Sequence, residues 1–228
     1  VGFVAIGQTL VILAGSLDLS VPYVISLASL VGGVVMAGQS SMIVPGVIAA
    51  LGVSALVGLA NGLVVTGLRV HGFIATLGVG LILSGYLASN YQGNAGKAPY
   101  DFQLWGILLL GPVPLSTIVM LACAGLGVLM LRRTRLGHQL YAVGGGREIA
   151  RMSGVRTGVP VVAAHVLCSV MSGVAGLLLL SRTSVGSPTI GSQGGYDLMS
   201  IAAVVLGGTR RSVMSRTPSN DDGGTPGC

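Results

Sequence analysis

The sequence predicts an all-α, polytopic helical membrane protein with about six to seven transmembrane helices. Of its 228 residues, 52% are hydrophobic and only 8% are charged, whereas soluble domains carry roughly 25% charged residues. The mean hydropathy is +0.86. The chain also has 38 glycines, which in an apolar sequence favour closely packed transmembrane helices. These observations exclude an ordinary soluble domain.

Charge and motif content exclude several classes of function. The net charge of +6 comes without a basic patch interleaved with aromatic residues, so nucleic acid is not an expected partner. Cys123 and Cys168 fall in apolar runs and Cys228 ends the chain, which leaves no disulfide or metal-ligand spacing. The segment Gly93–Ala98 lacks the first glycine and the Ser or Thr of a phosphate-binding loop. We therefore expect no enzyme activity, cofactor or metal.

Two apolar runs open the chain, at residues 1–15 and 21–37. The first begins without a basic segment, so we interpret it as part of a spanning helix whose start lies upstream. Leu17–Ser20 separates the runs, and Asp18 within it lies at or inside the membrane. An ionisable residue there is costly and usually functional, but Asp is also a good cap for the helix that begins near Val21. Both roles stay open.

The third and fourth spans are predicted at residues 43–67 and 73–88. The third carries a small residue at every fourth position, which allows another helix to approach closely. These residues are Ala50, Ser54, Gly58 and Gly62. Asn61 lies beside this stripe and could hydrogen-bond across it. Residues 89–112 are polar, and the aromatic residues in and beside them indicate the membrane–water boundary or a surface for a partner.

The fifth and sixth spans are predicted at residues 113–131 and 159–180. His165 lies in the sixth span, where a lone histidine is more often packed and hydrogen-bonded than a proton carrier. The last apolar run, residues 198–208, is about 16 Å long as a helix against about 30 Å of hydrocarbon, so it cannot span alone. Residues 210–228 are polar and predict a disordered or frameshifted tail. We thus expect residues 1–209 to be a transmembrane domain that is truncated at both ends.

The loop at residues 132–158 carries six of the twelve Lys and Arg residues. Within it, Arg147–Gly154 predicts a short helix that Gly154 ends. Ile149 and Met152, three residues apart, give this helix an apolar ridge against which a partner can press. The alternative is a solvated charged turn between two spans.

The sidedness of the chain follows from its basic residues. Short loops rich in Lys and Arg stay on the cytoplasmic side. Counting the spans alternately puts Arg69 and the loop at residues 132–158 on that side. Lys97 and Arg182 then lie on the other side, so the distribution of charge agrees with a cytoplasmic loop.

Four stretches together resemble the permease subunits of bacterial ABC importers of the ribose, xylose and galactose type. They occur in the family's order and are Gly7–Val21, Ala60–Gly78, Gly137–Val155 and Gly195–Thr209. The resemblance implies a multi-pass permease in the bacterial cytoplasmic membrane. It also implies a cytoplasmic ATPase subunit, an extracytoplasmic sugar-binding protein and a second permease copy, identical or different, within the lipid bilayer.

The resemblance further implies two groups of site residues. The segment Gly144–Gly154 matches the family's cytoplasmic coupling segment, where the ATPase engages the permease. The expected residues of this segment are Gly145, Gly146, Glu148, Ala150, Arg151, Ser153 and Gly154. Asp18, Ser20 and Asn61 match polar positions inside the membrane and are expected to line the translocation path.

The chain departs from the family at two places. His71-Gly72 stands where the family usually has a proline pair, and residues 210–228 replace a glycine-rich segment and further spans. A truncated, non-functional permease fragment is therefore one alternative. A branched-chain amino-acid permease is another, although Leu17–Val21 and Phe73–Gly78 favour a sugar. A secondary transporter, from a different class, would need coupling charges that the spans nearly lack.

Overall fold

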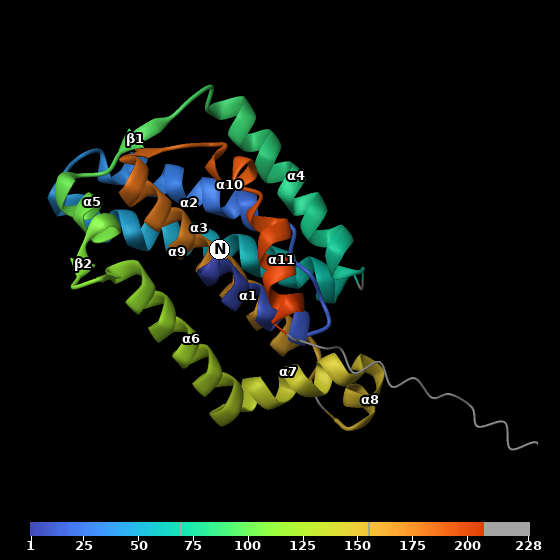
Figure 1. Cartoon of the computed structure of the whole chain (residues 1–228). Coiled ribbons are helices and arrows are strands. Elements are labelled where there is room, and N and C mark those ends of the chain that lie inside the picture. The colour runs from blue at the N-terminus through green and yellow to red at the C-terminus, as the bar shows by residue number, and fades with distance from the viewer. Residues whose placement is uncertain (69, 155, 208–228) are drawn as a thin grey trace, which may run out of the picture.

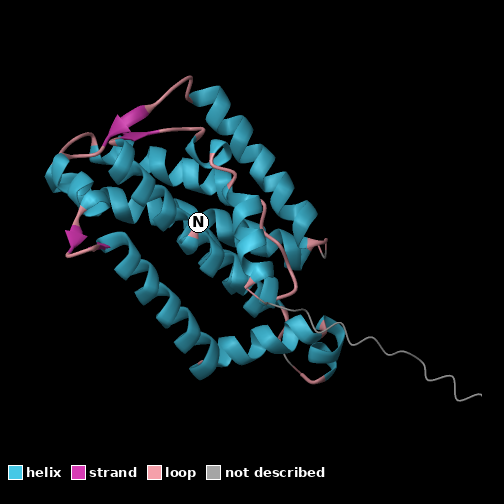
Figure 2. Ribbon diagram, in the orientation of Figure 1, coloured by secondary structure: helices cyan, strands magenta, loops and turns pink. Residues whose placement is uncertain are grey.

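The computed structural model describes residues 1–68, 70–154 and 156–207, which form a helical bundle (Figures 1 and 2). The α-helices in this part of the chain are α1 Gly2–Leu13, α2 Val21–Met36, α3 Ile43–Gly67, α4 Gly72–Asn90, α5 Tyr100–Ile107, α6 Leu115–Arg133, α7 Arg135–Gly145, α8 Arg147–Met152, α9 Gly158–Thr183, α10 Ile190–Gln193 and α11 Tyr196–Leu206. A 3-10 turn, Ser40–Met42, precedes α3. The short strands are β1 Ala95–Lys97, β2 Leu109–Leu110, β3 Val113–Pro114 and β4 Val185–Gly186.

Helix α9 runs through the centre of the bundle, with α1, α2 and α3 packed around it (Figure 1). Small residues permit the close approach of α3. A Cβ atom on Gly58 would lie 2.6 Å from the carbonyl oxygen of His165. One on Gly62 would lie 2.6 Å from the Cα atom of Val162. The small-residue stripe of α3 is buried, which confirms it as a surface for helix packing.

Among the residues that the structure describes, four helices are long and apolar enough to cross a membrane, namely α3 with its preceding turn, α4, α6 and α9. Three shorter apolar helices, α1, α2 and α11, accompany them in the described part of the chain. The six predicted spans correspond to α1, α2, α3, α4, α6 and α9, with ends that agree to within three residues. The predicted class, an all-α membrane protein, is confirmed.

Helix α6 lies at the outside of the bundle (Figure 1), and half-buried side chains such as Met120 and Met130 pack against the main core. None of its residues is buried, and Leu121, Leu126 and Leu129 are 61%, 65% and 55% exposed. Such a surface would be an association site on a soluble protein. In a bilayer, lipid tails cover it at no cost, because they are as apolar as leucine.

The polar stretch at residues 89–112 holds more structure than the sequence indicates. It contains β1, α5 and β2, and β1 pairs antiparallel with β4, which follows α9. Strands β2 and β3 form a short hairpin. Val113 and Pro114 are therefore in a strand, and the prediction that the fifth span begins at Val113 was wrong, because α6 begins at Leu115. Strands this short show no usable alternation.

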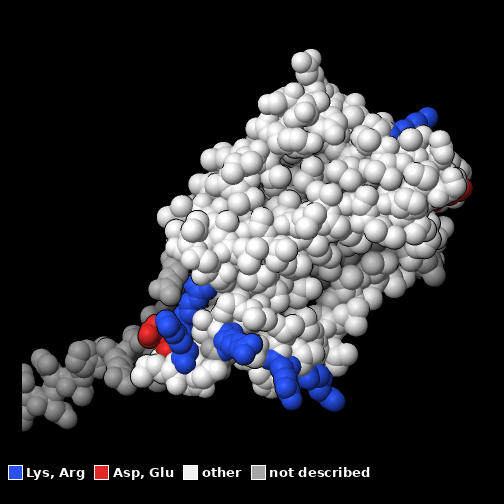
Figure 3. Space-filling view, turned by 180° about the vertical axis from the view of Figure 1, so that it is seen from behind, with Lys and Arg blue, Asp and Glu red and all other residues white. Residues whose placement is uncertain are grey.

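Charged side chains are segregated between the two ends of the bundle. Arginines at the end of α6, at the start of α7 and on α8 are exposed and gather at one end (Figure 3). Lys97 lies on β1, at the opposite end from α7 and α8 (Figure 1). Arg182 lies at that end too, since its Nε donates to the carbonyl oxygen of Gly106 in α5 (3.3 Å). This separation agrees with the predicted sidedness. Arg69 and the predicted tail at residues 210–228 lie outside the described residues.

Candidate functional site

A non-helical segment, residues 14–20, joins α1 to α2, and we call it the linker. At Gly15 the backbone has a φ of +76°, a left-handed conformation that favours glycine. Beyond it, alternate side chains point into the bundle. Ser16, Asp18 and Ser20 have exposed fractions of 5%, 0% and 0%. The linker thus places three polar side chains inside an apolar bundle.

The carboxylate of Asp18 has partners on both oxygens. Its Oδ1 accepts hydrogen bonds from the backbone nitrogen of Ser20 (2.9 Å) and from the Ser20 hydroxyl (2.6 Å). Its Oδ2 lies 3.4 Å from Nδ1 of His165, which is also fully buried. Asp18 therefore contacts both Ser20, the residue before α2, and the central helix α9.

Four helices supply side chains that hold the linker. Asn61 of α3 donates to the Ser20 hydroxyl (2.7 Å), and Gln8 of α1 donates to the carbonyl oxygen of Asp18 (3.2 Å). Thr76 of α4 accepts from the backbone nitrogen of Leu19 (3.0 Å). The other ring nitrogen of the α9 histidine, Nε2, lies 3.1 Å from the Ser16 hydroxyl. We call the following residues the linker cluster: Gln8, Ser16, Asp18, Ser20, Asn61, Thr76 and His165.

These contacts explain why a polar segment is stable at this depth. Non-helical backbone is tolerated in a membrane protein where protein groups satisfy its donors and acceptors. An unsatisfied buried polar group costs about 1–3 kcal/mol, and an unpaired charge costs more. In the linker cluster, one side-chain atom, Oδ1 of Asn61, is buried without a hydrogen-bond partner.

The three predicted path residues meet in this cluster. Ser20 accepts from Asn61 and donates to Asp18, so the three side chains form one hydrogen-bonded chain. All three are fully buried. Asp18 is not the cap of α2: the N-cap residue is Ser20, whose side chain makes no capping hydrogen bond, and the Asp18 carboxylate accepts from the backbone nitrogen of Ser20 instead. His165 is packed and hydrogen-bonded, as expected for a lone histidine in a span.

A second group of predicted residues lies on the hairpin formed by α7 and α8. Helix α8 matches the predicted short helix, and Gly154 follows it with a φ of +77°. Of the predicted coupling residues, the following are exposed: Gly145, Glu148, Arg151, Ser153 and Gly154. Gly146 is half-buried, and Ala150 is only 4% exposed. The side chain of Ala150 therefore packs toward the bundle.

The apolar ridge of α8 faces outward. Ile149 and Met152 are 70% and 84% exposed. Helix α7, which the sequence did not predict, anchors the hairpin because Leu140 and Val143 are buried in the main core. The hairpin is therefore anchored in the core through α7 and exposes apolar side chains on α8.

The hairpin touches the end of α1, immediately before the linker. The backbone of Gly144 packs against the carbonyl oxygen of Leu13, the last residue of α1, so closely that a Cβ atom would overlap it. A cavity of about 320 Å³ lies beside this contact. Its walls come from the linker, the turn between α3 and α4, and the α7–α8 junction, including Ser16, Gly72 and Arg147. The predicted path residues and the predicted coupling residues thus lie in neighbouring segments of the structure.

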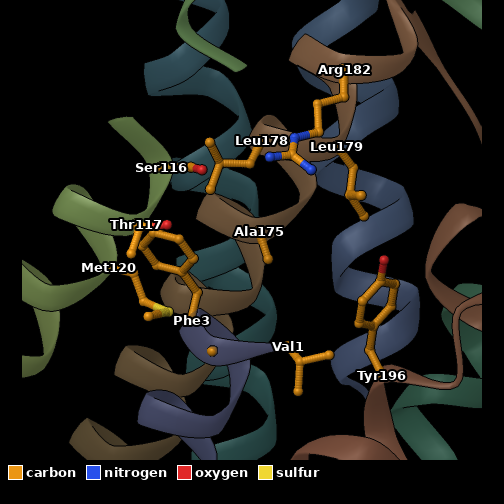
Figure 4. Close-up of a pocket in the computed structure, with 11 residues that line it drawn as sticks. Val1, Phe3, Ser116, Thr117, Met120, Ala175, Leu178, Leu179, Arg182 and Tyr196 are labelled. Carbon is orange, nitrogen blue, oxygen red and sulfur yellow. The ribbon is translucent and has the colours of Figure 1, made fainter. Parts of the chain in front are cut away.

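Another cavity, of about 250 Å³, lies between α1, α6, α9 and the start of α11 (Figure 4). Most of its wall is apolar, with the polar groups of Ser116, Thr117, Arg182 and Tyr196 around it. It lies roughly three to five turns further along α9 than His165. No cluster of three or more His, Cys, Asp or Glu residues that could hold a metal ion occurs in the described ranges.

Comparison with known proteins identifies the class of this architecture. Over residues 1–218 the chain matches the family described as "Branched-chain amino acid transport system / permease component". It is 36% identical to the ribose import permease protein RbsC of Escherichia coli (strain K12) over 214 residues, which is 90% of this chain and 64% of that protein. It is 34% identical to RbsC of Bacillus subtilis (strain 168) over 215 residues, 92% of this chain and 66% of the relative.

The L-arabinose transport system permease protein AraH of Escherichia coli (strain K12) is also similar, with 34% identity over 212 residues, 91% of this chain and 62% of that protein. The chain spans just under two thirds of the length of these relatives. No solved structure shows significant similarity to it. The relatives are named as permeases for sugars, which confirms the resemblance found in the sequence. By its match over residues 1–218, the chain is a membrane protein of the branched-chain amino acid transport system permease family.

Proposed function

We propose that the chain is the transmembrane permease subunit of an ATP-driven importer that carries a sugar across the bacterial cytoplasmic membrane. The observation that carries this proposal is the similarity to ribose and arabinose permeases over about nine tenths of the chain. The segregation of arginines to the α7–α8 end supports a cytoplasmic position for that end.

A separate cytoplasmic ATPase subunit drives the transport in this proposal. The sequence has no phosphate-binding loop of its own. The hairpin supplies the contact, since Ile149 and Met152 are exposed at its tip. Beside them, Glu148 and Arg151 are exposed charges that fix the register of the contact. Gly145, Gly146, Ser153 and Gly154 bound α8 and set its direction.

The opposite end of the subunit receives an extracytoplasmic sugar-binding protein. It carries α5 and the small sheet of β1 and β4. A second permease copy completes the transporter in the bilayer, and the translocation path lies between the two subunits.

The polar chain of Asp18, Ser20 and Asn61 lines this path when the bundle opens. Sugar hydroxyls both donate and accept hydrogen bonds, and a carboxylate, a hydroxyl and a carboxamide offer the complementary groups. In the conformation described here these three residues are fully buried, so the proposal requires a conformation in which they are exposed.

Uptake by the assembled transporter tests this function. Proteoliposomes with the permease, its ATPase and its binding protein are supplied with radiolabelled ribose, xylose or leucine, with and without internal ATP. ATP-dependent uptake of a sugar supports the proposal. Leucine uptake would instead favour an amino-acid permease, a candidate that the description of the matching family supports. Uptake that persists with an inactivated ATPase would overturn the importer and indicate a secondary transporter.

A further inference from the structure

Building on the proposed function, we infer that His165 is a positioning residue that holds the linker closed and that the α7–α8 hairpin moves the linker against this hold. The linker is then a hinge between α1 and α2. Its state decides whether the predicted path residues are buried or accessible. The inference rests on the geometry of the linker cluster and on its contact with the hairpin.

The way in which the linker is held permits movement. A helix keeps its backbone groups in a ladder of internal hydrogen bonds, so it moves as a rigid body. The linker depends on side chains that belong to four different helices, with Gln8, Asn61 and Thr76 contacting it from three sides. A displacement of one helix therefore changes the linker's contacts without breaking a helix.

His165 is the one residue of the cluster that binds two linker side chains through two separate atoms. Its Nε2 lies 3.1 Å from the Ser16 hydroxyl, and its Nδ1 lies 3.4 Å from the carboxylate of Asp18. A tight charge-assisted hydrogen bond is about 2.7–2.9 Å long. The contact between His165 and Asp18 is longer than this, so a modest displacement of the linker would break it. The other contacts of the carboxylate are to Ser20, which belongs to the linker and moves with it.

The hairpin is placed to apply this displacement. Gly144 packs on the carbonyl oxygen of Leu13, the residue of α1 immediately before the linker, so closely that a Cβ atom would overlap this oxygen. Gly72, the first residue of α4, packs equally closely on the hydroxyl of Ser16. The cavity of about 320 Å³ between the linker and the hairpin supplies the room for movement. A push on α8 is therefore delivered to the residues that His165 holds.

Cys168 offers a built-in reporter of the hinge. It lies one turn beyond His165 on α9, is fully buried, and its thiol donates to Gln8 of the cluster (3.5 Å). Cys123, half-buried on α6, is a matched reference outside the cluster. Methyl methanethiosulfonate converts a cysteine thiolate to a mixed disulfide and releases methanesulfinate. The rate of this reaction at a buried thiol reports how often the surrounding structure opens.

The experiment uses the assembled transporter with Cys228→Ser as the parent. The rates at Cys168 and Cys123 are measured by peptide mass spectrometry in three variants. His165→Leu removes both ring contacts while keeping a side chain of similar bulk. His165→Gln restores a hydrogen-bonding group. Ser169→Ala removes a buried hydroxyl that has no hydrogen-bond partner and is the control.

We expect His165→Leu to accelerate labelling of Cys168 about tenfold or more, since loss of the hold raises the open population. His165→Gln should recover most of the slow rate, and Ser169→Ala should not differ from the parent. The rate at Cys123 should stay constant throughout. An unchanged rate at Cys168 in His165→Leu would overturn the inference, and so would equal acceleration at both cysteines, because that indicates general loosening.

The parent protein alone provides a test that needs no destabilising substitution. Labelling is compared between the nucleotide-free transporter and the transporter trapped with ADP and vanadate. A change of about threefold or more at Cys168, with Cys123 constant, supports a hinge driven through the hairpin. Identical rates in both states overturn it. Since labelling does not depend on uptake, an absence of sugar transport with the expected labelling would reject the proposed function and leave the hinge intact.

Discussion

The linker and α8 reverse the usual distribution of side chains in opposite ways. The linker buries Asp18 at 0% exposure in an apolar bundle, whereas α8 leaves Met152 84% exposed at an arginine-rich end. A buried carboxylate needs partners, and the linker finds them within the bundle. An exposed apolar ridge needs a cover. Local rules of sequence and structure are most often broken at functional sites, and these two segments are adjacent.

The two segments are expected to affect different properties: the linker affects the stability of the fold, and α8 affects association with a partner. The linker's polar groups are satisfied by Gln8, Asn61, Thr76 and His165, so changes there should lower the stability of the fold. The ridge of α8 contributes little to the core, so changes there should leave the fold intact and affect only a partner.

The largest loss of stability is expected for Asp18→Ala. It removes the partner of His165 Nδ1 and of the backbone nitrogen and hydroxyl of Ser20 in the interior, and each buried polar group left unsatisfied costs about 1–3 kcal/mol. The measurement is unfolding in detergent, monitored as the loss of monodisperse protein. Asp101→Ala is the control, because Asp101 is exposed and bonds the exposed Ser40. Equal effects of the two substitutions would show that the linker cluster is not a stabilising network.

A smaller loss is expected for Thr76→Val. The substitution keeps the shape of the side chain but removes the oxygen that accepts from the backbone nitrogen of Leu19. Leaving that partly buried donor unsatisfied costs about 1 kcal/mol, at the low end of the range of about 1–3 kcal/mol for buried groups. Thr66→Val is the matched control, since its hydroxyl bonds carbonyl oxygens of its own helix. A difference of less than about 0.5 kcal/mol between the two variants would contradict a holding role for Thr76.

The sequence predicted the polar residues of the linker better than the residues of other helices that contact them. Asp18 stands out because a carboxylate between two apolar runs is rare, Asn61 was expected to hydrogen-bond across the small-residue stripe, and Ser20 followed from the resemblance. Gln8, Thr76 and His165 could not be joined to them, since these contacts link residues as far as 149 positions apart. Hydrophobic periodicity carries no information on such pairs.

For the hairpin, the sequence did carry a signal, but the composition masked it. Helix α7 has a signal, because Leu136, Leu140 and Val143 recur at helical spacing, but the flanking arginines and glycines gave the stretch the composition of a loop. The resemblance also included Ala150 among the coupling residues. Only tertiary packing reveals that Ala150 faces the core while its neighbours Ile149 and Arg151 are exposed.

Gly144→Ala tests the contact between the two regions. Its Cβ atom would overlap the carbonyl oxygen of Leu13, so the hairpin must move away from α1. We expect a loss of about 1 kcal/mol, at the low end for overpacking because the hairpin lies at the surface, together with loss of ATP-coupled uptake. Gly85→Ala on α4, where the added atom meets nothing within 4 Å, should cause neither loss. Normal uptake by Gly144→Ala would separate the hairpin from the linker functionally.

The smallest effect on stability, and the largest on association, is expected for Met152→Ser. With the side chain 84% exposed, the free energy of unfolding should change by less than about 0.5 kcal/mol. Truncating an apolar anchor of an interface costs more than about 1 kcal/mol of binding, so affinity for the ATPase subunit should fall about tenfold. Tyr141→Ser is the control, as Tyr141 is exposed on α7 of the same hairpin. If both variants bind the ATPase equally well, the ridge of α8 is covered by something else. If Met152→Ser unfolds as Asp18→Ala does, the contrast between an internally satisfied linker and an externally covered helix is wrong.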